Sequence, residues 1–143
     1  MKILGILAGV VFAAVMLSVL MLVMGVNFQS PSTAQGAALY NSADEVSVQG
    51  IVQSVEDFDC PVSEGEVSGH LNLKTSGGVL QVHLAPVRIL RSQKISFMPG
   101  DSIGVVGSKI RLAGTKGIIA REITRNTETI IFRDQSGQLI MTQ

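Results

Sequence analysis

The chain has 143 residues, a formal net charge of zero and few aromatic side chains. This length allows one modest core besides a membrane segment and is too short for two domains of ordinary size. The single cysteine, Cys60, excludes an internal disulfide. A neutral chain with few aromatics is a poor match to single-strand nucleic-acid binders, which stack bases along a positive groove.

An uninterrupted apolar run occupies residues 3–26 and is preceded by one charge, Lys2. As a helix, these 24 residues would reach roughly 36 Å, more than the roughly 30 Å hydrocarbon core of a membrane. We therefore expect residues 1–26 to be a transmembrane signal anchor. Because Lys2 flanks one side and acidic residues follow on the other, the amino terminus is expected in the cytoplasm. This predicts a single-pass protein of the cytoplasmic (inner) membrane, with its C-terminal domain in the periplasm or outside.

A cleaved signal peptide is the alternative interpretation of the same run. Its hydrophobic region is usually only about 7 to 15 residues long and ends at small residues. The stretch Ser32-Thr33-Ala34 offers such a pattern, with cleavage after Ala34. Both interpretations predict an exported domain.

The rest of the chain divides into a linker, residues 27–43, and a β-rich domain, residues 44–143. Alternating apolar residues and Gly, Pro and Asp turn signals predict its elements. These are a strand at 46–55, a loop at 56–69, a hairpin at 71–84, a short helix at 86–93, strands at 103–112 and 118–123, and a final hairpin at 129–141. This order predicts an all-β fold, a small OB-fold-like Greek-key barrel with one short helix between its third and fourth strands.

Several motifs make this prediction more specific. They are Gly69-His70-Leu71-Asn72-Leu73-Lys74-Thr75, Val82-His83-Leu84-Ala85-Pro86, and Pro99-Gly100-Asp101. Through them the chain, over roughly residues 46–141, resembles a group of exported bacterial OB-fold proteins of unknown function. Ala85 departs from the glycine usual in that group. The membrane-anchored OB-fold haem chaperone of cytochrome c maturation is similar in architecture, but its C-terminal His and Tyr have no counterpart here.

The two histidines are predicted to share one face of the hairpin. If the two-residue turn is Ser76-Gly77, His70 lies directly opposite His83, and if it is Gly77-Gly78 the two are diagonal neighbours. Both registers put the rings on one face, because strand side chains alternate with period two. The predicted ligand-binding face consists of His70, Lys74, Gln81 and His83, and we expect it to be exposed and turned away from the core.

A metal ion is one ligand that this face predicts. Directly opposed Cβ atoms are about 4.5 to 5.5 Å apart, so two imidazoles can share an ion. The predicted loop before the hairpin adds Cys60 and several carboxylates, a donor set suited to zinc or copper. These carboxylates are Glu56, Asp57, Asp59, Glu64 and Glu66. The alternatives are a solvated histidine pair, a histidine-mediated protein contact and a pH response.

Charge is unevenly distributed along the chain. Residues 27–73 carry seven acidic side chains and no basic one, whereas residues 74–143 carry ten basic and four acidic side chains. This segregation predicts either an interaction surface or neutralisation across the fold, of which we favour neutralisation.

Catalysis is not expected, because the sequence has no nucleophile elbow, no phosphate loop and no zinc-protease helix. We expect a membrane-anchored accessory module that recognises a protein partner of the cell envelope or a metal ion. Nucleic-acid or oligosaccharide binding on the OB-fold face is the alternative, with nucleic acid disfavoured by the acidic first loop and the exported location. A redox role of Cys60 is a second alternative.

The topology can be tested with a reporter that is active only in the exported compartment, fused after Gln143. We expect activity, because residues 3–26 should leave the domain outside. Activity of a cytoplasm-specific reporter at the same site would reverse the assignment. A mature protein that begins at Gln35 would replace the anchor by a signal peptide.

Overall fold

A computed structural model describes residues 39–63 and 65–141. The chain divides into two compact units, Met1–Ser30 and Pro31–Gln143, and the described residues belong to the second. The predicted membrane segment and most of the predicted linker lie outside the described residues. Within the described part, no helix is both long and apolar enough to cross a membrane.

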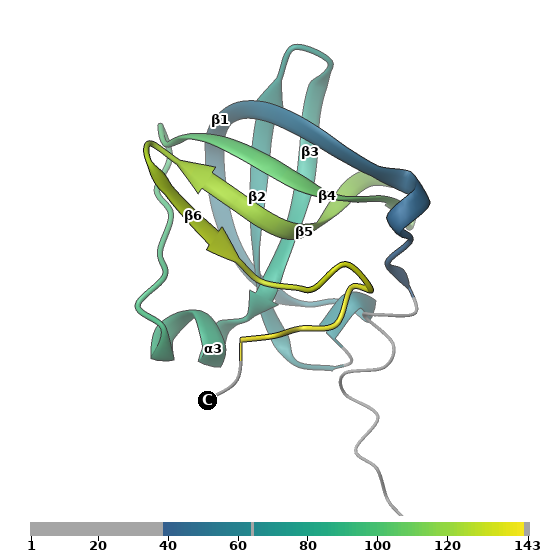
Figure 1. The fold of residues 1–143 in the computed structure, drawn as a ribbon. Helices are drawn as coiled ribbons and strands as arrows, with labels where there is room; N and C mark the ends of the chain where they lie inside the picture. The colour runs from purple at the N-terminus through teal and green to yellow at the C-terminus, as the bar shows by residue number, and fades with distance from the viewer. Residues whose placement is uncertain (1–38, 64, 142–143) are drawn as a thin grey trace, which may run out of the picture. The chain divides into compact units, whose positions relative to one another are not determined.

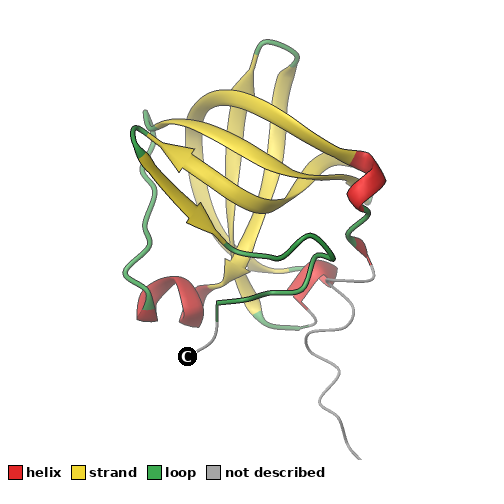
Figure 2. Ribbon diagram, in the orientation of Figure 1, coloured by secondary structure: helices red, strands yellow, loops and turns green. Residues whose placement is uncertain are grey.

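The described residues of the second unit form one six-stranded sheet with a short helix (Figures 1 and 2). The strands run in the order β3-β2-β1-β4-β5-β6, and β3 also pairs in parallel with β5, so the sheet closes on itself. The elements are η2 (Ser42–Asp44), β1 (Glu45–Asp59), η3 (Pro61–Ser63), β2 (Val67–Thr75), β3 (Gly78–Pro86), α3 (Val87–Ser92), β4 (Ser102–Leu112), β5 (Thr115–Arg125) and β6 (Glu128–Ile131).

The predicted all-β, OB-fold-like architecture with one short helix is confirmed. The helix α3 follows β3 and lies at the end of the sheet away from the β2–β3 turn (Figure 1). It begins directly after Pro86, where the fixed φ of proline suits a helix start. Its residues Ile89 and Leu90 are buried, and Leu90 packs in the main core.

Two predicted boundaries were wrong. The strand β1 continues to Asp59, so Glu56, Asp57 and Asp59 lie on a strand and not in the predicted loop. Their backbone pairs with β2 while their side chains are exposed to water, so β1 carries these charges without burying them. The final hairpin is also different: β6 pairs with β5 and not with residues 138–141. The chain does turn at residues 134–137, where the Asp134 amide donates to the Gln138 carbonyl oxygen and an isolated bridge joins Arg133 and Leu139.

The predicted core is confirmed on the inner face of the hairpin. Leu71, Leu73, Val82 and Leu84 are all buried. They pack in one cluster with Val52, Val105 and Ile123 from other strands and with Phe132, which directly follows β6. Branched and aliphatic residues therefore supply most of this core, as the scarcity of aromatics in the sequence requires.

The hairpin turn takes the first of the two predicted registers. Thr75 pairs with Gly78 and His70 pairs with His83, so Ser76-Gly77 is the two-residue turn. The Thr75 hydroxyl donates to the Gly78 carbonyl oxygen at 2.8 Å and accepts from the Gly77 amide at 3.1 Å. Gly78 has a φ of +114°, which a residue with a side chain rarely adopts.

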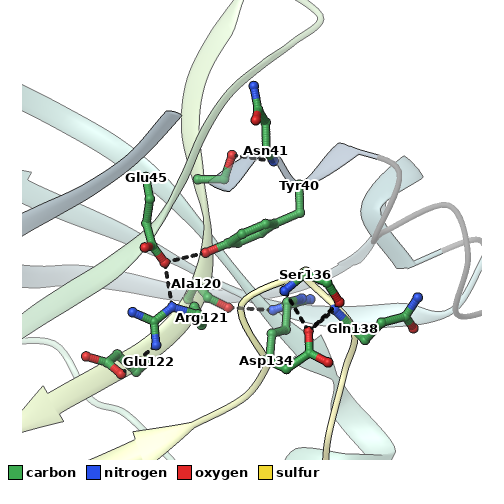
Figure 3. Close-up of polar contacts among 11 residues, drawn as sticks. Tyr40, Asn41, Glu45, Ala120, Arg121, Glu122, Asp134, Ser136 and Gln138 are labelled. Carbon is green, nitrogen blue, oxygen red and sulfur yellow. Dashed lines mark hydrogen bonds and ion pairs between the residues drawn. The ribbon is translucent and has the colours of Figure 1, made fainter. Parts of the chain in front are cut away.

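Ion pairs join the acidic and the basic parts of the chain. Glu45 pairs with Arg121, and Glu66 pairs with Arg88. Figure 3 shows the first pair, in which the Glu45 carboxylate also accepts a hydrogen bond from Tyr40. These contacts agree with charge neutralisation across the fold.

We predict that Leu73→Ala lowers the free energy of unfolding by about 2 to 5 kcal/mol, because it opens a cavity in a packed core. Val79→Ala is the matched control in the same hairpin, since Val79 is 54% exposed, and it should change stability by less than about 0.5 kcal/mol. Urea unfolding of the full chain in a non-ionic detergent, followed by circular dichroism, measures both. Equal effects of the two substitutions would contradict the assignment of the inner face.

Candidate metal centre

The two histidines lie on the outer face of the hairpin but are not exposed. His70 on β2 is 1% exposed and His83 on β3 is 3% exposed, so the prediction of an exposed site was wrong. The end of β1 and the η3 turn cover this face. Cys60, Val62 and Ile119 form a second buried cluster there, separate from the main core.

Cys60 lies between the two imidazoles. Its Sγ is 3.2 Å from Nε2 of His70 and 3.6 Å from Nδ1 of His83. The three donor atoms lie within 4.8 Å of one another, and all three residues are buried. The thiol also lies 3.5 Å from the hydroxyl of Ser63, at the end of η3.

A backbone contact fixes the tautomer of His70. Its Nδ1 is 2.9 Å from the carbonyl oxygen of Ser68. Because a carbonyl oxygen only accepts, Nδ1 carries the proton, and the lone pair of Nε2 faces the sulfur of Cys60. Histidines that bind metals are commonly oriented in this way, with the second ring nitrogen donating to a backbone carbonyl.

Neighbouring rings and a glycine hold the imidazoles in place. Phe58 stacks on His70, with ring centroids 3.7 Å apart and planes inclined by 9°. The His70 and His83 rings meet edge to face at 4.8 Å. A side chain on Gly117 would come within 3.1 Å of Nε2 of His83. The absence of a Cβ at Gly117 therefore lets β5 pack against His83.

Burial keeps both imidazoles neutral. Desolvation lowers the pKa of His70, opposed mainly by its hydrogen bond to the Ser68 carbonyl. Desolvation also lowers the pKa of His83 to about 3, with further repulsion from His70 and Arg133. Neutral imidazole is the form that binds a metal ion.

Arg133 is a buried cation beside this group. Its side chain is nearly inaccessible, and Nη1 donates to the Ala120 carbonyl oxygen at 2.7 Å. Burial lowers the pKa of Arg133 to about 10, although Tyr40 and Cys60 act in the opposite direction. The guanidinium therefore stays charged at neutral pH. Sequence analysis did not single out this residue, since a lone arginine near a turn carries no signal of burial.

The other predicted site residues are not part of the cluster. Lys74 is exposed and Gln81 is half-buried, both nearer the hairpin turn than the histidines. Of the predicted carboxylates, Glu56 is held by Asn72 at 2.9 Å and Glu66 pairs with Arg88. Among the described residues, no carboxylate joins Cys60, His70 and His83 as a ligand.

Tyr40 closes one side of the second cluster and was likewise not predicted. It is 7% exposed and comes from the end of the predicted linker. Its hydroxyl donates to Glu45 at 2.6 Å, and Glu45 also accepts from Arg121 (Figure 3). Burial and the Glu45 carboxylate raise the pKa of Tyr40 to about 12. Gly137, at a φ of +85°, packs so closely on Tyr40 that a Cβ there would clash with it.

The arrangement around Cys60 resembles a metal site. Ligand atoms bound about 2.0 to 2.3 Å from one ion lie roughly 3.3 to 3.8 Å apart. The separations of 3.2 and 3.6 Å around Cys60 are close to these values, whereas the three donor atoms together span up to 4.8 Å, so the two imidazoles must move closer to share one ion. One thiolate and two imidazoles suit zinc or copper.

Fold and site together define a small OB-fold-like protein with a buried Cys-His-His cluster. The family model of the MamS/MamX magnetosome protein family matches residues 44–130, more than half of the chain. The chain therefore belongs to the MamS/MamX magnetosome protein family. This match does not confirm the more specific resemblance to exported OB-fold proteins of unknown function. A comparison with curated proteins found no match.

Two solved structures are distantly similar to this chain. A crystal structure of the Stn1-ten1 complex of S. pombe matches with a TM-score of 0.45 and 18% identity, over 59% of this chain and 59% of that chain. The match thus spans less than two thirds of that protein. The OBody AM1L10 bound to hen egg-white lysozyme matches with a TM-score of 0.41 and 16% identity, over 71% of this chain and 89% of that chain. Neither similarity identifies a function for this chain.

We predict that the metal-free protein loses stability as the pH falls below about 6.5. The unfolded chain takes up protons on its histidines near this pH, whereas His83 resists protonation down to about pH 3 in the folded state. The difference for His83 amounts to about 1.4 kcal/mol per pH unit within this window, and stability is fully present above it.

Urea unfolding at several pH values, with a chelator present, measures this slope. His83→Leu removes the titrating group at similar volume, and its slope should be shallower between pH 6.5 and 4. Carboxylates titrate in both proteins and cancel in the comparison. Identical slopes would show that His83 is not held neutral by burial.

Proposed function

We propose that this chain is an accessory module of the cell envelope that binds one metal ion through Cys60, His70 and His83. The observation that carries the proposal is the convergence of three donors from separate places in the sequence on one buried point. Cys60 lies between β1 and η3, which cover the outer face of the hairpin, and the histidines come from the paired strands β2 and β3. Its membership of a magnetosome protein family agrees with an accessory role in an envelope compartment.

The orientation of the donors is the one that a ligand role requires, although a hydrogen bond from the thiol to His70 would use the same orientation. Here the Ser68 carbonyl holds the proton of His70 on the far nitrogen, so that the lone pair points to the sulfur. The chain is proposed to act by binding and not by catalysis. Attachment to the membrane through residues 3–26, and contact with an envelope protein, are part of this proposal.

Metal binding can be measured on the full chain in a non-ionic detergent, after removal of bound metal. We expect one equivalent of zinc or copper to bind and to raise the unfolding temperature. Cys60→Ser and His70→Gln should each abolish most of the affinity, because every donor contributes one of only three bonds. Acid should release the metal only well below pH 6.5, because burial lowers the pKa of His83.

Ser63→Ala is the matched control for this experiment. The Ser63 hydroxyl contacts the sulfur of Cys60 but is not one of the three donors. Its loss should leave metal affinity within a few-fold of the native value. A native protein that binds neither metal, with no change in thermal stability, would reduce the cluster to a hydrogen-bonded part of the core.

A further inference from the structure

We infer that the metal centre is built for a monovalent soft ion, Cu(I), and that Arg133 discriminates against divalent ions. This inference rests on the proposed metal binding and names the ion. It follows from the charges that surround the site, which the three donors alone do not determine. Zinc and copper both suit a thiolate and two imidazoles.

Charge balance on binding distinguishes the two ions. When Cu(I) binds, the Cys60 thiol loses its proton to solvent, and the products are a neutral copper-thiolate unit and one released proton. The oxidation state of the copper does not change, and the buried site gains no charge. When Zn(II) binds in the same way, one positive charge remains in the site. Both histidines stay neutral ligands in either case.

Arg133 makes an added positive charge costly. The guanidinium is 5% exposed, and Nη1 is fixed on the Ala120 carbonyl oxygen. Ala120 directly follows Ile119, which pairs with His83 across β3 and β5. Electrostatic interactions of Arg133 with both Cys60 and His83 agree with this placement. A buried charge without a counter-charge is strongly unfavourable, so a second cation here is disfavoured.

The described carboxylates that act on the site do not restore the balance. Asp57 and Glu56 are the acidic groups that act on His70, and both side chains are exposed on β1. Solvent screens charges at such positions, so they offset little of a buried charge. Among the described residues, the cluster offers three donors and no further carboxylate or histidine ligand. This set suits Cu(I), which accepts low coordination numbers, whereas zinc with three protein ligands would need water as its fourth.

The test measures two affinities on the full chain in detergent. Cu(I) is titrated without oxygen in competition with the chelator bicinchoninate, and Zn(II) is titrated against a colorimetric zinc indicator. Arg133→Met removes the charge and keeps a long apolar side chain. We expect the variant to bind Zn(II) roughly 10- to 100-fold more tightly, with the Cu(I) affinity changed by no more than a few-fold. Arg111→Gln removes an exposed arginine charge and should change neither affinity.

Each outcome separates the two proposals. Equal shifts for both ions in Arg133→Met, or no shift for either, would overturn the role of Arg133 and leave metal binding intact. Native protein that holds Zn(II) and does not take up Cu(I) would overturn the choice of ion alone. Failure to bind either ion would instead contradict the proposed function.

A measurement on the native chain covers the case in which Arg133→Met does not fold. X-ray absorption of the Cu(I)-loaded protein should show one sulfur and two nitrogen ligands, and loading near neutral pH should release one proton per ion. Two-coordinate copper, or copper with more than one sulfur, would overturn the inference.

Discussion

The register of the β2–β3 hairpin is the constraint on which the site depends. With Ser76-Gly77 as the turn, His70 and His83 become directly opposed, and Leu71, Leu73 and Val82 face the other side. A shift by one residue would exchange the faces, burying the polar set in the main core and exposing the apolar set. The burial of Leu71, Leu73, Val82 and Leu84 therefore holds the two imidazoles together. Stability of the core and geometry of the site are consequences of the same pairing.

Side-chain alternation made much of this arrangement predictable. The inner face of the hairpin, the shared face of the histidines, the helix after Pro86 and the order of the strands all follow from local patterns of apolar residues, Gly and Pro. These features depend on neighbours within about ten residues, or on the closure of one tight turn. Cys60 was predicted as a ligand because its thiol can bind metal and because it precedes the hairpin in sequence. Neither reason predicts its contact with the histidines.

Burial of the histidines was not predictable in the same way, because it depends on contacts distant in sequence. Strand alternation predicts that a side chain points away from the main core, but not whether another segment covers that face. Here η3 and Phe58 cover the pair, Tyr40 closes the cluster from the linker side, and Arg133 is placed by contacts with β5. The acidic residues before Pro61 indicated an open loop, whereas pairing with β2 extends β1 to Asp59 and brings η3 over the histidines. A single charged residue such as Arg133 is usually exposed, and only the packed structure identifies it as an exception.

Residues 58–63, which cover the histidines, also change which ligands this OB-fold-like face can bind. Proteins of this architecture commonly bind ligands on the outer face of strands two and three. In this chain the ring of Phe58 is already stacked on His70, so it is not free to receive a base or a sugar. The covering segment supplies Cys60 as well. Any local opening that exposes the histidines to solvent therefore withdraws the sulfur at the same time. For the proposed metal ion, entry and release would require the same local unfolding, so the stability of residues 58–63 would affect the rate of exchange together with the strength of the metal-ligand bonds.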